Sequence, residues 1–159
     1  MDSLDGNFSI DLVLMHRDLE NKWGSDLPLA SEKGYPEIFD KMVYWVLCAN
    51  RKPIAHTGSL VSNGRRFALV GNTYVRKEWR SKGLHSHLLN ERNNAHWLKD
   101  IPKITVLNPI EGVTTEQLVS VVSKLGYTQV ESYADVEDVM TGKEYKQIHL
   151  PPLQIWRLD

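Results

Sequence analysis

The sequence predicts an α/β (α+β) domain in which a mixed sheet carries helices. Runs rich in β-branched and aromatic residues recur along the chain, segments with apolar residues at helical spacing separate the later runs, and Gly, Pro and Asn mark the joins. A chain of 159 residues can bury one proper core, so we expect a single domain over residues 1–159.

The first half is predicted to run in the order strand, two short helices and three antiparallel strands. The Asn63-Gly64 pair is a strong hairpin signal between the last two of these strands. The expected strands are 8–15, 43–49, 54–61 and 66–75, and the expected helices are 16–23 and 35–42.

The second half is predicted to run helix, strand, helix and two strands. Thr114-x-x-Gln117 is a capping box that opens a helix ending at Gly126. The expected helices are 83–98 and 114–125, and the expected strands are 103–107, 127–133 and 144–158, the last bent at Pro151-Pro152. The whole chain is therefore expected to hold about six to seven strands and about four helices.

Composition excludes several classes of protein. Hydrophobic residues are 42% and charged residues 25%, which is typical of a globular domain, and no apolar run reaches the roughly 20 residues of a membrane span. The acidic first residues do not resemble a secretory signal. The single cysteine, Cys48, excludes a disulfide within the chain, so we expect a cytoplasmic protein.

Charge is unevenly distributed along the chain. Residues 1–40 carry a net charge of −6, residues 51–103 carry +8, and residues 104–159 carry −4. The basic segment suits an anionic ligand. The acidic N-terminal segment either attracts a cationic substrate or simply covers a surface.

A phosphate-binding turn is predicted where the basic segment joins a strand to a helix. The run Arg80-Ser81-Lys82-Gly83 follows a predicted strand and precedes Leu84, Leu88 and Leu89 at helical spacing. The first N–H groups of a helix have no internal partner and the helix dipole is positive there, so a small turn lets a phosphate approach the backbone. A solvated basic turn is the alternative. The spacing is neither a Walker A loop nor a Rossmann fingerprint.

The order of residues in this stretch resembles motif A of the GNAT superfamily, the acyl-CoA-dependent N-acyltransferases. Val75, Arg80 and Gly83 match the signature V-x-P-x-x-(Q/R)-x-x-G-x-(G/A), whereas Lys77 replaces its proline and His85 its last small residue. The element order is similar to the whole GNAT fold, and Leu125-Gly126-Tyr127 resembles the L-G-F/Y ending of its last helix.

The resemblance implies a sheet splayed between its fourth and fifth strands, with acetyl-CoA as the co-substrate lying in the gap. An amine acceptor, a small molecule or a protein, would attack the thioester directly in a ternary complex. The backbone of 74–76 would pair with the pantetheine arm, and a backbone N–H there would polarise the thioester carbonyl. The predicted cofactor-binding residues are Tyr74, Val75, Arg76, Arg80, Ser81, Lys82, Gly83, Leu84, His85 and Asn108.

The catalytic residues are the least determined part of the site. Many members carry a tyrosine as general acid four residues before the glycine of L-G-F, and Val122 stands there. Ser123 and Tyr127 are substitutes for that acid, and His56 or Asn72 for the base or a water-orienting group. A histidine on a strand also has ordinary structural roles.

Two other functions stay open on the sequence alone. One is a GNAT-like domain that binds an acyl-CoA or a protein partner without catalysis. The other is a nucleic-acid or phosphoprotein binding module that uses the basic segment, although no aromatic cluster accompanies these charges. Histidines 85, 87 and 96 do not form a metal-binding pattern, so no metal is expected. We expect neither nucleic-acid nor membrane partners; a homodimer stays open.

Overall fold

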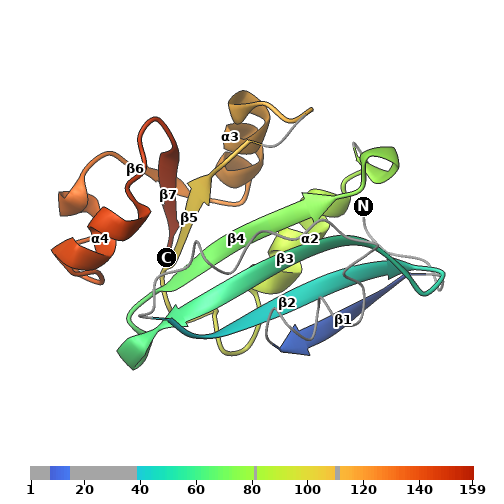
Figure 1. Ribbon diagram of the computed structural model, residues 1–159, viewed down its shortest axis with the longest axis horizontal. Coiled ribbons are helices and arrows are strands. Elements are labelled where there is room, and N and C mark those ends of the chain that lie inside the picture. Colours follow the sequence, from blue (N-terminus) through green and yellow to red (C-terminus); the bar gives the residue numbers. More distant parts are fainter. Residues whose placement is uncertain (1–7, 15–38, 81, 110–111) are drawn as a thin grey trace.

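A computed structural model shows a seven-stranded sheet with the strand order β1-β2-β3-β4-β5-β7-β6 (Figure 1). The structure describes residues 8–14, 39–80, 82–109 and 112–159. The strands are β1 (Phe8–Leu14), β2 (Phe39–Ala49), β3 (Lys52–Ser62), β4 (Ala68–Val75), β5 (Lys103–Leu107), β6 (Thr128–Val130) and β7 (Gln154–Leu158). Over the described residues the α-helices are α2 (Leu84–Asn93), α3 (Thr115–Lys124) and α4 (Gly142–Ile148).

The sheet is mixed and opens between β4 and β5. These parallel strands pair only at Ala68 with Lys103 and at Leu69 with Ile104. The later residues of both strands, all of them described, are not paired with each other, so the strands diverge. The predicted mixed sheet with a splay between its fourth and fifth strands is therefore confirmed.

A β-bulge lies in β4 where the strands diverge. His56 pairs with Tyr74 and Gly58 pairs with Gly71, so Thr57 alone opposes Asn72 and Thr73. A bulge leaves its extra residue out of the ladder and bends the strand that carries it.

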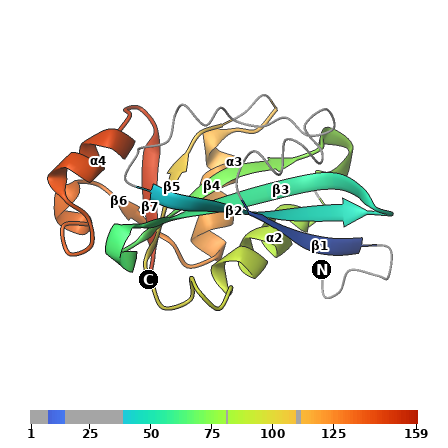
Figure 2. The same cartoon turned by 60° about the horizontal axis from the view of Figure 1, so that its bottom comes forward.

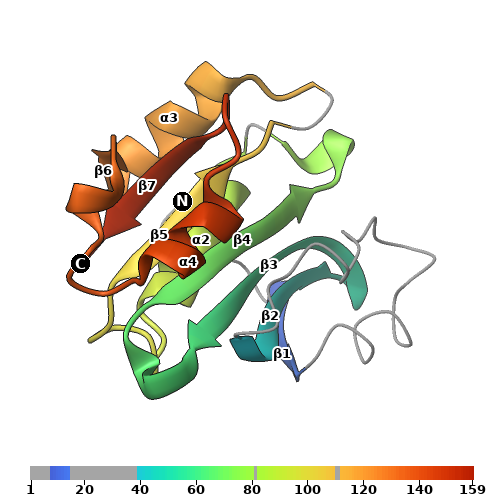
Figure 3. The ribbon, with the colours of Figure 1, turned by 60° about the vertical axis from the view of Figure 1, so that its left-hand side comes forward.

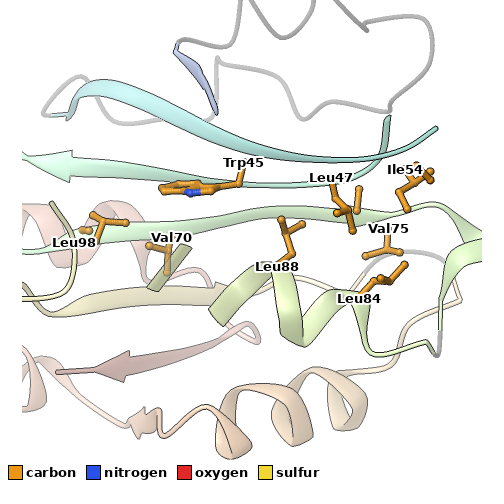
Figure 4. Packing of buried hydrophobic residues seen from close by; sticks show 11 residues of the cluster. Trp45, Leu47, Ile54, Val70, Val75, Leu84, Leu88 and Leu98 are labelled. Atoms are coloured by element: carbon orange, nitrogen blue, oxygen red, sulfur yellow. The ribbon is translucent and has the colours of Figure 1, made fainter. Parts of the chain in front are cut away.

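Helices cover both faces of the sheet. Leu84 and Leu88 of α2 pack with Val70 of β4 in one core (Figure 4). Leu69, next to Val70, packs in a second core with Ile148 of α4. Adjacent strand residues point to opposite faces. Helices α2 and α4 therefore lie on opposite sides of β4, as the oblique views also show (Figures 2 and 3).

Some predicted elements need correction. The described part of the predicted helix 35–42 is strand: Phe39 and Met42 belong to β2, where they pair with Ser62 and Leu60 of β3. Helix α2 ends at Asn93 rather than near 98. The predicted strand 144–158 is helix α4 followed by the shorter strand β7, and β6 is shorter than predicted. The predicted helix 16–23 lies outside the described residues. Among the described elements, no helix is long and apolar enough to cross a membrane.

Candidate acyl-CoA site

Helix α2 follows a glycine in a left-handed conformation, and its first N–H groups face the helix entrance. Its N-cap, Gly83, has φ +77° and ψ 2°, a left-handed conformation that favours glycine. As a glycine, this N-cap has no side chain that could accept a hydrogen bond from the first turn. The N–H of His87 donates to the carbonyl of Gly83 at 3.1 Å, which leaves the preceding N–H groups of the first turn directed at the helix entrance.

A cavity of about 670 Å³ connects this helix end with the gap between β4 and β5. Its lining includes Gly83, His85 and Leu89 on the α2 side and Ile148 and Leu153 on the α4 side. Because α2 and α4 cover opposite faces, the cavity passes through the sheet at the splay.

Arg80 lies at the entrance of the cavity. Its Nε donates to the carbonyl of Val75 at 2.8 Å, and its guanidinium carbon lies 5.7 Å from the centre of the Tyr74 ring. The loop after β5 approaches it closely, since a Cβ added to Gly112 would lie 3.2 Å from Arg80 Nη1. The entrance therefore holds a positioned cation between two loops.

His85 is a neutral side chain in the cavity wall. Burial, and then the positive charge of Arg92, lower the pKa of its imidazole from 6.5 to about 4. A neutral imidazole can donate one hydrogen bond to a ligand, but with this pKa it is too weak a base for an amine.

Arg92 is the most buried charge in the wall, with 2% of its surface exposed. Its Nη1 donates to the hydroxyl of Thr57 at 2.8 Å, Nη2 to the hydroxyl of Tyr127 at 3.1 Å, and Nε to Oδ1 of Asn93 at 3.1 Å. Burial lowers the pKa of the guanidinium.

Half of the predicted cofactor-binding residues line the cavity, namely Val75, Arg80, Gly83, His85 and Asn108. Lys82 is exposed beside Gly83, whereas Leu84 is buried in the core behind it. Ser81 lies outside the described residues.

The backbone of Tyr74 and Arg76 pairs with β3 rather than facing the gap to β5. The N–H of Arg76 donates to the carbonyl of Ile54 at 2.8 Å, and its Nε donates to the carbonyl of Pro53 at 2.8 Å. Tyr74 pairs with His56 of β3. The backbone N–H of Arg76 is thus engaged inside the sheet.

The structure does not bring the predicted catalytic side chains of His56, Ser123 and Tyr127 together. Thr57 reaches Arg92 on the α2 face, so the neighbouring His56 points to the other face, buried between the rings of Tyr44 and Tyr74. The hydroxyl of Tyr127 also contacts Oδ1 of Asn93 at 3.2 Å and is absent from the cavity wall.

The other two predicted catalytic residues lie on α3 and β4. Ser123 is exposed on α3 and does not line the cavity, whereas the adjacent Val122 does. Asn72 lies in β4 at the bulge, where its backbone borders the splay.

Arg92 was not predicted as a site residue, although its position carried a signal. It follows Leu84 and Leu88 at intervals of four, so a helix that buries both leucines also turns residue 92 inward. Over the described ranges there is no group of three or more His, Cys, Asp or Glu that could hold a metal ion.

The structure resembles solved structures, whereas two comparisons of the sequence found no match. The sequence matches no family model and has no significant match among curated proteins. The structure is similar to the ribosomal-protein-S18-alanine N-acetyltransferase of Escherichia coli, with a TM-score of 0.60 and 16% identity over 95% of this chain and 92% of that one.

Two further solved structures resemble it over nearly their whole length. Arabidopsis thaliana Naa50 in complex with the bisubstrate analogue CoA-Ac-MVNAL has a TM-score of 0.59 and 13% identity, over 96% of this chain and 99% of that one. An acetyltransferase of the GNAT family from Staphylococcus aureus Mu50 has a TM-score of 0.57 and 11% identity, over 94% and 98%. The chain therefore has the GNAT fold, as the resemblance in its sequence predicted.

Proposed function

We propose that the protein is an acyl-CoA-dependent N-acyltransferase that transfers an acetyl group from acetyl-CoA to a primary amine by direct attack in a ternary complex. One observation carries the proposal: a single cavity joins the uncapped N-terminus of α2 to the gap between β4 and β5 and continues to the opposite face of the sheet. The fold shared with GNAT acetyltransferases supports it.

Each part of the cavity has a task in this proposal. The first-turn N–H groups of α2, with Lys82 and Arg80, bind the diphosphate of coenzyme A. The gap between the strands receives the pantetheine arm. At the bulge, a backbone N–H of 72–75 polarises the thioester carbonyl. The amine enters from the α4 face and attacks the carbonyl carbon of the thioester. The N–C bond forms, the C–S bond breaks, and the proton that the amine nitrogen loses is taken up by the departing thiolate.

The chemistry of the wall favours an acceptor amine of low pKa. Over the described residues, no carboxylate lines the cavity, and His85 is too weak a base. Only about one in 2,500 lysine-type amines is unprotonated at pH 7, against about one in seven peptide α-amines. We therefore propose a peptide N-terminus as the acceptor.

A binding domain without catalysis is the second candidate. Val122, which lines the cavity, stands at the position where many family members carry the tyrosine that serves as general acid. None of the described lining residues is a carboxylate. Such a domain would bind acetyl-CoA and release no thiol with any amine.

Release of free coenzyme A thiol from acetyl-CoA tests the proposal. We expect release with a short peptide that has a free α-amine, and much slower release with Nα-blocked lysine at pH 7. If the rate of thiol release equals the background rate with every amine, the protein is not an acyltransferase and the second candidate, a binding domain without catalysis, is favoured.

The Gly83→Val variant connects this activity to the turn. A β-branched residue at φ +77° would reshape the helix entrance, so coenzyme A binding and thiol release should be lost while the fold persists. Gly64→Val is the matched control, because Gly64 has φ +78°, is exposed, and lies away from the cavity. If Gly83→Val binds coenzyme A as well as the wild type, the phosphate-turn assignment is wrong.

A further inference from the structure

Arg92 is a buried cation whose protein partners are all neutral. Its three hydrogen bonds go to two hydroxyl groups and one amide oxygen, and over the described residues it forms no ion pair. A guanidinium has five N–H groups, so two remain for a ligand.

Arg92 lines the cavity on the α2 face of the sheet, beside the bulge. It is seven residues after His85 on α2, about 10 Å along the helix axis from the phosphate-binding end. Its partner Thr57 opposes the bulge and is hydrogen-bonded to Thr73 of β4 at 2.7 Å between their hydroxyl oxygens. Thr105 of β5 is close by, since a Cβ added to Gly71 would lie 3.8 Å from its Oγ1.

The electrostatic surroundings of Arg92 invite an anion. Over the described residues, its one ionisable partner is the hydroxyl of Tyr127, and no carboxylate contacts it. After burial, its positive charge also helps to lower the pKa of His85 and of Lys103. A buried charge without a counterion is costly, and an apolar residue of similar size usually serves a core as well or better. A buried charge retained in the wall of a cavity is therefore better explained by a ligand than by packing.

We propose that Arg92 binds a carboxylate group of a substrate in the part of the cavity that lies on the α2 face of the sheet. This inference rests on the proposed transfer of an acyl group from a coenzyme A thioester, and in its favoured form it replaces the acetyl group of that proposal by an acidic acyl group. The carboxylate would be carried either by the acyl group, as in a dicarboxylic acyl-CoA, or by the acceptor amine. Because Arg92 lies on the α2 face with the phosphate-binding turn, the structure favours the acyl group.

Matched thioesters test the acyl source. Succinyl-CoA and butyryl-CoA have acyl chains of four carbons and differ by a terminal carboxylate. We expect the wild type to bind succinyl-CoA at least tenfold more tightly, and Arg92→Gln to reduce this ratio to near one. Arg65→Gln, at an exposed arginine away from the cavity, should leave the ratio unchanged.

Matched acceptors test the other source. With acetyl-CoA as donor, thiol release is compared for two peptides that differ only by Asp or Asn at the N-terminus. A preference of at least tenfold for Asp that Arg92→Gln removes would assign the carboxylate to the acceptor. The ratio is the readout because a purely structural arginine would change stability and leave the selectivity as it was.

The results of these experiments distinguish failure of the carboxylate site from failure of the proposed acyltransfer function. If the wild type binds both thioesters equally and accepts both peptides equally, the carboxylate site is overturned and acyltransfer stands. If no thioester binds and no thiol is released, the proposed function fails and the inference fails with it. Because equal binding of both thioesters and equal use of both peptides by the wild type overturns the carboxylate site, the inference stays testable even if Arg92→Gln does not fold.

Discussion

At the scale of single residues, His85 shows how the cavity wall sets the charge of a side chain. The GNAT signature has a small residue at this position, and here an imidazole lines the cavity beside Gly83. Burial and the nearby Arg92 keep it neutral at physiological pH by holding its pKa at about 4. A ligand at the helix entrance therefore meets a hydrogen-bond donor rather than a third positive charge.

This pKa predicts a dependence of stability on pH. In the unfolded chain the imidazole takes up a proton near pH 6.5, whereas in the fold it does so only near pH 4. Acidification across this window should thus destabilise the wild type by at most about 3 kcal/mol through His85. His85→Gln should lose this component in urea unfolding measured from pH 7 to pH 4.

An exposed histidine supplies the control for this measurement. Other groups in the protein also respond to the change of pH, so the informative quantity is the difference in unfolding free energy between variant and wild type. His96→Gln, at an exposed position, should follow the wild-type curve. Parallel curves for His85→Gln and the wild type would show that the imidazole is not held neutral.

At the scale of elements, an ion pair between Arg66 and Glu144 adds to the apolar contacts that hold α4 against the sheet. Both guanidinium nitrogens of Arg66 contact the carboxylate of Glu144, at 2.8 and 2.7 Å, and Arg66 Nη1 also donates to the carbonyl of Val139 at 2.8 Å. Glu144 also caps its own helix through Thr141. The hairpin between β3 and β4 thereby fixes the helix that closes the cavity on the α4 side.

Removing this arginine should destabilise the protein measurably. Arg66→Ala leaves a buried carboxylate without its partner, and because Arg66 is partly exposed we expect a loss of about 2 kcal/mol in urea unfolding. The pKa of Glu144 is held low mainly by Arg66, so the ion pair stabilises the fold above the usual carboxyl pKa and less as the pH falls below it. The difference between variant and wild type should therefore shrink in acid.

Lys143→Ala provides the comparison within the same helix, because Lys143 is exposed. We expect it to change stability by less than about 0.5 kcal/mol. An Arg66→Ala variant as stable as Lys143→Ala would mean that the apolar contacts of α4 suffice.

Local signals predicted some elements well and missed others for physical reasons. The capping box of Thr114 and Gln117 predicted α3, and both of its hydrogen bonds are present. Thr141 and Glu144 form the same motif. The sequence nevertheless predicts a strand over 144–158, because α4 has only 7 residues and its Glu144 is held by Arg66, which lies 78 residues away in the sequence.

Long-range pairing explains the other main error. Phe39 and Met42 form strand because they pair with residues of β3 some twenty positions later. In the site, the turn at Gly83 follows a local pattern and was predictable. The contacts of Arg92 with Thr57 and Tyr127 each span 35 residues, so no local pattern contains them.

At the scale of the whole molecule, binding of acetyl-CoA should stabilise the fold as a unit. A ligand at 100 times its dissociation constant contributes about 2.7 kcal/mol, which for a chain of this size corresponds to a rise of about 5–10 °C in melting temperature. Differential scanning fluorimetry measures this shift. A nucleic-acid or phosphoprotein binding module would show no shift with acetyl-CoA.

The short ladder between β4 and β5 has a consequence for how the molecule holds together. Among the residues that the structure describes, two backbone pairs in the sheet join β1–β4 to the second half, formed by β5, β7 and β6. In the proposed function, a coenzyme A thioester bound between these halves would supply contacts that the backbone leaves out. Binding of the thioester would then hold the two halves of the sheet together, and release of coenzyme A would loosen them.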